Sequence, residues 1–169
     1  MKTIVLTGMS GCGKSSVGKA LAQKLNIKFV DVDEEIVFLE KKSINDIFAK
    51  SGEKYFRELE SQQIIKSFTE QNLVIALGGG AFENENTRNF LLNNATVVYL
   101  QAGAQTILDR LKNSTNRPLL NNNNMNLITI EKLLNSRKNN YELAHFSVIT
   151  DNKTIEEILG EIIKCVNLK

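Results

Sequence analysis

The chain of 169 residues contains few of the residues that mark disulfide-rich, metal-binding or multidomain proteins. Its two cysteines, Cys12 and Cys165, lie far apart and fit no metal-binding spacing, which favours reduced thiols in a cytoplasmic protein. With a single proline, Pro118, and no Ser/Gly-rich stretch, the sequence marks no linker. We therefore expect one domain over residues 1–169, in a chain long enough to bury about 70% of its unfolded surface.

The sequence also has no large excess of charge of one sign and no long apolar run. The chain has 21 basic and 19 acidic residues, a formal net charge of +2. Proteins that bind nucleic acid or a membrane surface usually carry a basic excess, and a membrane span needs a much longer apolar run than any seen here. We expect neither partner, and we expect a monomer.

Short apolar runs recur along the chain and are rich in Val and Ile without clean alternation: 3–7, 28–32, 73–77, 96–100 and 146–150. Such runs are typical of strands buried on both faces, as in a parallel sheet. Apolar residues at helical spacing predict helices over 14–25, 54–70 and 154–166. The alternation predicts an α/β fold with a three-layer, doubly wound, five-stranded parallel sheet, whose strand order the pattern leaves open.

Residues 8–15, GMSGCGKS, match G-x-x-x-x-G-K-[ST] between a predicted strand and a predicted helix. In such a P-loop, backbone N–H groups at a helix N-terminus hold phosphate oxygens. The lysine, Lys14, reaches the β- and γ-phosphates, and the Ser15 hydroxyl ligates Mg²⁺. The sequence thus predicts a nucleoside triphosphate site. The D-x-x-G and N-K-x-D elements of switch GTPases are missing, which argues against a molecular switch.

Asp31 and Asp33 close the second predicted strand. Alternate residues of a strand share a face, so both carboxylates would point to the carboxyl edge, where open α/β sheets bind ligands. One could orient the water shell of the metal while the other accepts a hydroxyl proton. The alternative is that Asp33 caps a helix over 34–42.

Two further motifs each allow two interpretations. Arg57 and Glu60 lie at i, i+3, either as a surface ion pair or with Glu60 fixing a guanidinium that grips a substrate carboxylate. Gly78–Gly80 follow a predicted strand, either as a tight turn or as backbone that a ligand approaches closely.

Residues 112–127 interrupt the alternation with four consecutive asparagines and the only proline. We predict a mobile lid there, in which Arg117 resembles an arginine finger; a surface insertion with a solvated arginine is the alternative. Cys12 lies by a helix N-terminus, an environment that raises thiol reactivity, so we hypothesise a reactive thiol. The single histidine, His145, is interpreted as structural.

The motifs GMSGCGKSS, DVD, FRELE, ALGGG, NRPLL and RKNNY, in this order and spacing, resemble the shikimate kinase family along essentially the whole chain. The resemblance implies a P-loop NTPase of the nucleoside-monophosphate-kinase-like type, with strand order 2-3-1-4-5. It also implies Mg²⁺-dependent transfer of the ATP γ-phosphoryl to the 3-hydroxyl of shikimate, in the pathway to chorismate and the aromatic amino acids. One departure is Asn139, where the family often has proline.

The resemblance also assigns roles to individual residues. It implies catalysis by Lys14, Asp33 and Arg117, with Asp33 as the base. It implies ATP binding by Gly11, Cys12, Gly13, Lys14, Ser15, Ser16, Arg110 and Arg117, with the 151–154 loop beside adenine. It implies shikimate binding by Asp33, Arg57, Gly79, Gly80 and Arg137. The metal would be held by Ser15 and, through water, by Asp31.

Three other functions remain open on these motifs. A gluconate kinase or a nucleoside monophosphate kinase shares the P-loop but would use a different acceptor. A non-catalytic nucleotide-binding module would bind ATP without turnover, although the retained Lys14, Ser15, Asp33 and Arg117 argue against it. A coupled assay with shikimate, gluconate and CMP as acceptors distinguishes the three.

Overall fold

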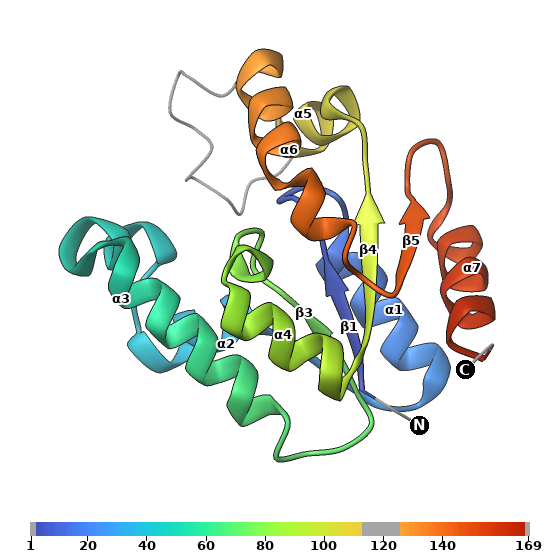
Figure 1. The fold of residues 1–169 in the computed structure, drawn as a ribbon, viewed down its shortest axis with the longest axis horizontal. Coiled ribbons are helices and arrows are strands. Elements are labelled where there is room, and N and C mark those ends of the chain that lie inside the picture. Colours follow the sequence, from blue (N-terminus) through green and yellow to red (C-terminus); the bar gives the residue numbers. More distant parts are fainter. Residues whose placement is uncertain (1–2, 113–125, 168–169) are drawn as a thin grey trace.

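The computed structural model describes residues 3–112 and 126–167 (Figure 1). Most of the predicted lid at 112–127, including Arg117, therefore lies outside the described residues. Among the described residues, no helix combines the length and the apolar character needed to cross a membrane.

Five strands form one sheet in the order β2-β3-β1-β4-β5, and every neighbouring pair is parallel. The strands are β1 (Ile4–Thr7), β2 (Lys28–Asp31), β3 (Leu73–Ala76), β4 (Thr96–Gln101) and β5 (Phe146–Ile149). Each lies within one of the predicted runs or extends it by a single residue. The doubly wound parallel sheet and the strand order implied by the resemblance are both confirmed.

The helices follow the strands in alternation and lie on both sides of the sheet (Figure 1). They are α1 (Lys14–Leu25), α2 (Val32–Glu40), α3 (Ile44–Ser67), α4 (Glu85–Asn94), α5 (Ala104–Lys112), α6 (Leu127–Tyr141) and α7 (Ile155–Asn167), with a short 3₁₀ turn η1 (Ala81–Glu83). The predicted start of α3 at residue 54 is wrong. Ser43 caps the helix much earlier, its Oγ accepting from the Asp46 N–H at 3.1 Å, and the helix continues across a break at Gly52.

Two apolar cores lie on opposite faces of the sheet, because alternate residues of each buried strand point to opposite sides. On β1, Ile4 and Leu6 pack with α1, α5, α6 and α7, whereas Val5 packs toward α2, α3 and α4. This arrangement explains why the runs show no apolar–polar alternation: both faces are covered by helices.

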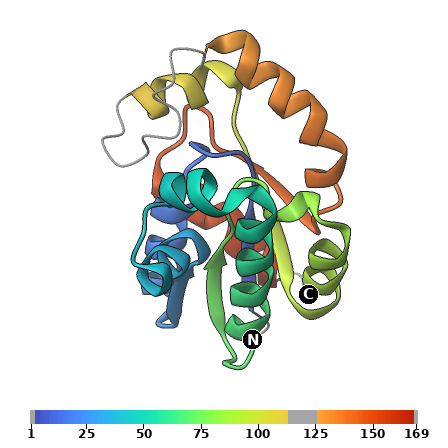
Figure 2. The ribbon, with the colours of Figure 1, turned by 90° about the vertical axis from the view of Figure 1, so that its left-hand side faces the viewer.

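The carboxyl ends of the parallel strands all meet at one edge of the sheet. The P-loop follows β1, the Asp31–Asp33 segment closes β2, and the glycine triplet follows β3. In both views α5 and α6 lie beyond this edge (Figures 1 and 2). The topology therefore brings the predicted motifs together where open α/β sheets bind ligands.

Candidate functional site

The P-loop has the backbone that its glycines allow. Gly8, Gly11 and Gly13 have φ values of 138°, 87° and 104°, a region that favours glycine. Gly13 is the N-cap of α1, so the first free N–H groups of the helix open at the loop. Lys14 is 5% exposed, and its Nζ donates to the carbonyls of Gly8 at 2.8 Å and Met9 at 3.0 Å.

Arg110 connects the P-loop to the loop that follows β5. Its Nη1 donates to the Cys12 carbonyl at 3.1 Å and to Thr150 Oγ1 at 3.1 Å, and its Nη2 donates to the Thr150 carbonyl at 3.0 Å. Asp151 accepts from the Gly103 N–H at 3.0 Å. The structure thus brings Arg110 and the start of the 151–154 loop together beside the P-loop, where the resemblance puts adenine.

Cys12 and His145 both have structural surroundings. The Cys12 side chain is 1% exposed and packs in the core on the α1 face, which contradicts the hypothesis of a reactive thiol, because a reagent needs access to the sulfur. His145 Nδ1 accepts from the Val97 N–H at 3.0 Å, which confirms the structural interpretation of this residue.

Asp33 lies in a helix and not on β2, so the predicted shared strand face is wrong, although Asp31 and Asp33 do line one cavity at the carboxyl edge of the sheet. Asp31 ends β2 and caps α2, its Oδ1 accepting from the N–H groups of Asp33 at 3.1 Å and Glu34 at 3.3 Å. The cap is therefore Asp31 and not Asp33. Because this cap starts the helix immediately, Asp33 lies in the first helical turn.

The second carboxylate oxygen of Asp31 faces the P-loop. Oδ2 accepts from the Ser15 hydroxyl at 2.6 Å, which places one carboxylate and one hydroxyl side by side at the start of α1. Mg²⁺ prefers oxygen ligands and is usually held by one or two protein groups together with water and substrate phosphates. The Ser15–Asp31 pair therefore fits such an ion.

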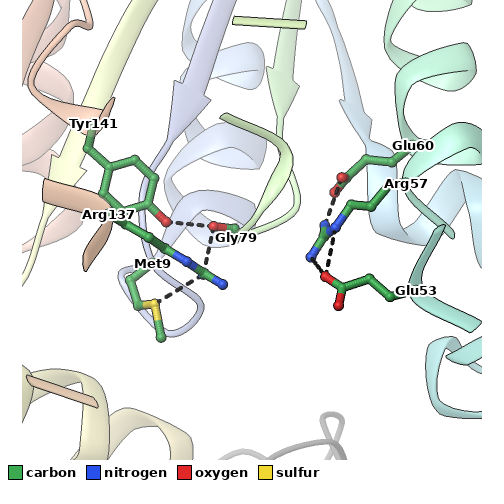
Figure 3. Close-up of polar contacts among 7 residues, drawn as sticks. All are labelled: Met9, Glu53, Arg57, Glu60, Gly79, Arg137 and Tyr141. Carbon is green, nitrogen blue, oxygen red and sulfur yellow. Dashed lines mark hydrogen bonds and ion pairs between the residues drawn. The ribbon is translucent and has the colours of Figure 1, made fainter. Parts of the chain in front are cut away.

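The ion pair between Arg57 and Glu60 is not a surface pair. Nη1 of Arg57 lies 2.8 Å from Oε2 of Glu60, whose side chain is 2% exposed, and Nη2 lies 3.1 Å from Oε1 of Glu53 (Figure 3). Burial raises the pKa of Glu60 to about 7 although Arg57 lowers it, and Asp33 raises it further. Of the two interpretations left open by the sequence, the structure favours a buried carboxylate that fixes the guanidinium.

Arg137 approaches from the other side, on α6. Its Nη1 donates to the Gly79 carbonyl at 3.0 Å and contacts Met9 Sδ at 3.6 Å. In Figure 3 the guanidinium groups of Arg137 and Arg57 extend toward the same space from opposite sides. Two arginines that are far apart in the sequence are therefore brought to one site.

The glycine triplet is required by its neighbours. A Cβ at Gly78 would collide with Glu60 and lie 2.8 Å from Asp33 Oδ1, and one at Gly80 would lie 2.5 Å from Arg57 Nη2. A side chain there would push these groups away, because real Cβ atoms do not approach that closely. A plain tight turn therefore does not account for the triplet, because the protein's own side chains need its open backbone; the close approach of a ligand stays a prediction.

The two arginines Arg57 and Arg137, the glycine triplet and the Ser15–Asp31 pair border one cavity of about 700 Å³. It is lined by Ser10, Ser15, Asp31, Asp33, Glu34, Val37, Phe38, Ser43, Ile44, Asn45, Phe48, Phe56, Arg57, Glu60, Gly78, Gly79, Gly80 and Arg137. Sequence reasoning missed the aromatic wall, in which the rings of Phe48 and Phe56 lie 4.8 Å apart. Their apolar helical spacing is the same whether they pack in a core or line a cavity.

The buried Glu60 predicts a measurable pH dependence of stability. Its pKa is raised from 4.5 to about 7 in the folded protein, so in this window the folded state binds more protons than the unfolded state. The free energy of unfolding should therefore fall as pH rises through the window, by at most about 3 kcal/mol.

Urea unfolding at several pH values should show a smaller fall for Glu60→Gln than for the parent. Equal falls in the free energy of unfolding for Glu60→Gln and the parent would contradict the prediction. The control is Glu53→Gln, which removes the exposed partner of Arg57.

Comparison with known proteins identifies the relatives of this chain. The model of the shikimate kinase family matches residues 10–167. A shikimate kinase of Sulfurihydrogenibium sp. (strain YO3AOP1) is 46% identical over 163 residues, covering 96% of each chain. One of Bacillus cereus (strain G9842) is 39% identical over 99% of this chain and 100% of its own.

Solved structures of shikimate kinases also resemble this chain. A shikimate kinase from Acinetobacter baumannii in complex with shikimate has a TM-score of 0.92 and 33% identity, covering 99% of this chain and 94% of its own. A gluconokinase from Sinorhizobium meliloti 1021 has a TM-score of 0.63 at 19% identity, covering 99% of this chain and 92% of its own, and this likeness shows the fold alone. With the family matched over nearly its full length, the chain belongs to the shikimate kinase family, ATP-dependent kinases that phosphorylate shikimate.

Proposed function

We propose that this chain transfers the ATP γ-phosphoryl to the 3-hydroxyl of shikimate through the residues of the cavity described above. The observation that carries the proposal is that Arg57 and Arg137 line one cavity together with Asp33 and the glycine triplet. Shikimate has one carboxylate and three ring hydroxyls, so two guanidinium groups suit one end of the molecule and a single carboxylate base suits the other.

The two arginines would form the clamp for the substrate carboxylate. A planar guanidinium can donate two parallel hydrogen bonds to a carboxylate, which fixes orientation as well as position. Glu60 and Glu53 hold Arg57, and the Gly79 carbonyl holds Arg137, so neither guanidinium depends on the substrate for its position. Backbone N–H groups of Gly79 and Gly80 would complete this end.

At the other end, Asp33 would accept the proton of the 3-hydroxyl as its oxygen attacks the γ-phosphorus. The bond that forms joins this oxygen to phosphorus, and the bond that breaks joins phosphorus to the β–γ bridging oxygen, which leaves with ADP. Lys14 and the P-loop N–H groups would stabilise the charge on the phosphoryl oxygens. When bound, Mg²⁺ supplies further neutralisation of phosphate charge, and Ser15 and, through water, Asp31 would hold it.

Arg117 would close over the phosphates as an arginine finger; it lies outside the described residues, so its role rests on the resemblance. We also propose that the enzyme works as a monomer. A cytoplasmic location is supported by Cys12 and Cys165, which are both free thiols, as expected in a reducing compartment.

The clamp gives the experiment that tests this function. Arg57→Lys and Arg137→Lys should each raise the KM for shikimate at least several-fold, because an ammonium cannot replace the bidentate contact; the loss is about 1–3 kcal/mol. The KM for ATP should change far less, since neither arginine is assigned to the nucleotide and the contact of Arg137 with the P-loop is limited to the Met9 sulfur at 3.6 Å. Both constants are measured at a saturating concentration of the other substrate.

Arg88→Lys is the matched control for the clamp. Arg88 is bound to the carbonyls of Phe82 and Glu83 and does not line the cavity, so its replacement should leave the KM for shikimate unchanged. A parent enzyme that phosphorylates gluconate or CMP but not shikimate would overturn the proposed function. Unchanged shikimate constants in both clamp variants would overturn the clamp.

A further inference from the structure

Tyr141 is the last residue of α6, and its side chain is completely buried. The phenol hydroxyl donates to the Gly79 carbonyl at 2.5 Å (Figure 3). The same carbonyl accepts from Arg137 Nη1 at 3.0 Å. One carbonyl oxygen of the glycine triplet is therefore held by two side chains from one helix.

The Tyr141 hydroxyl remains a donor over the pH range of an enzyme assay. Burial raises its pKa well above the ordinary value for tyrosine, although Arg137 lowers it. The ring is also held in place, since it stacks on Tyr99 with the centroids 5.0 Å apart and the planes at 23°. The hydroxyl therefore has a fixed position and a fixed protonation state.

The contacts that hold the Gly79 carbonyl also fix the direction of the Gly80 N–H. The Gly79 carbonyl and the Gly80 N–H belong to one planar trans peptide, so they point in opposite directions. With the carbonyl turned toward α6, the N–H of Gly80 points away from α6, and the Arg57 guanidinium borders the same glycine, since a Cβ there would lie 2.5 Å from Nη2. Within the described part of the chain, no hydrogen bond of the structure uses this N–H, so it is available to a substrate oxygen.

Consecutive glycines need such a constraint more than other residues. Glycine loses the most conformational freedom on folding, and this triplet has no side chains of its own to anchor it. A phenylalanine at 141 would fill the same space and stack on Tyr99 equally well. The hydroxyl is therefore the part of Tyr141 that packing does not explain.

We propose that Tyr141 is a positioning residue for shikimate: its hydroxyl, with Arg137, orients the Gly79–Gly80 peptide so that the Gly80 N–H points at the substrate carboxylate. The proposal deepens the proposed function and rests on it, because it assumes that shikimate occupies this cavity. Tyr141 acts through the peptide and does not contact the substrate.

Tyr141→Phe tests this role by removing one hydroxyl. We expect the KM for shikimate to rise about five- to tenfold, the effect of one hydrogen bond. The KM for ATP should stay within about twofold, because the P-loop is not part of the contact. Direct binding of shikimate, measured by titration calorimetry without ATP, should weaken by the same factor as the KM rises.

Tyr99→Phe is the matched control, because it removes the hydroxyl of the stacked partner while keeping the ring pair. In the described part of the chain the Tyr99 hydroxyl makes no hydrogen bond, so its removal should leave both KM values unchanged. Equal rises for ATP and shikimate in Tyr141→Phe, or a shikimate KM within twofold of the parent, would overturn the positioning role alone. A parent that neither binds nor phosphorylates shikimate would overturn the proposed function together with it.

Discussion

Lys14→Met is expected to lower kcat by at least about 100-fold, because a positioned charge on the transferring phosphoryl group is worth that much or more. The Lys14 ammonium is buried and already held at the P-loop by the Gly8 and Met9 carbonyls. It can therefore follow the γ-phosphoryl oxygens with little reorganisation. Methionine keeps an unbranched side chain of similar length and removes the ammonium group, with its charge and its hydrogen bonds to the two carbonyls. The measurement is kcat with both substrates saturating.

Lys19→Met provides the matched control for this variant. Lys19 lies on the same helix, α1, and makes an exposed ion pair with Glu34 at 3.1 Å, so it carries the same charge but lies outside the loop. Its replacement should change kcat by less than about twofold, because exposed pairs contribute little. A Lys14→Met enzyme that retains over half of the parent kcat would contradict the role of Lys14.

The fold was predictable because strong local signals agree with one another. The β1 run, the glycine loop and the helix α1 follow one another directly. Together they form the strand–loop–helix unit that the P-loop motif needs, so the three signals support one another. The remaining strands are short Val/Ile-rich runs without alternation, a pattern typical of strands buried on both faces. Strand order is set by long-range packing, which no local pattern records, so it came from the family resemblance.

The site was less predictable, because its geometry depends on where the chain turns. The spacing of Asp31 and Asp33 fits a strand, but the Asp31 side chain caps its own following helix and so ends the strand early. In the same way, an i, i+3 pair of Arg57 and Glu60 looks identical on a surface or under a loop. The glycine triplet, which lies on a different element, packs against Glu60 at Gly78 and contributes to the burial of that carboxylate.

Asp33 is the residue on which the proposed chemistry depends most. Its carboxylate lies in the first turn of α2 and lines the cavity, with Oδ1 close to Gly78 and near the Glu60 carboxylate, whose pKa it raises. A base must lie within reach of the hydroxyl that it deprotonates, and Asp33 lines the same cavity as Ser15 and the two clamp arginines. An asparagine there would keep the shape of the side chain and could still accept a hydrogen bond from the hydroxyl, but it could not take up the proton.

Asp33→Asn is therefore expected to lower kcat by about 100-fold or more, the usual contribution of a general base. The KM for ATP should stay near that of the parent, since the P-loop contacts are unchanged, and thermal unfolding should show a folded protein. Asp46→Asn is the control, because Asp46 is an equally sized carboxylate on α3 that accepts from the Ser43 hydroxyl and does not itself line the cavity, and the kcat of this variant should match the parent. An Asp33→Asn enzyme with parental kcat would show that the 3-hydroxyl loses its proton to another acceptor. A raised shikimate KM with unchanged kcat would instead make Asp33 a binding residue, because removal of uniform binding affects KM and leaves the chemical step alone.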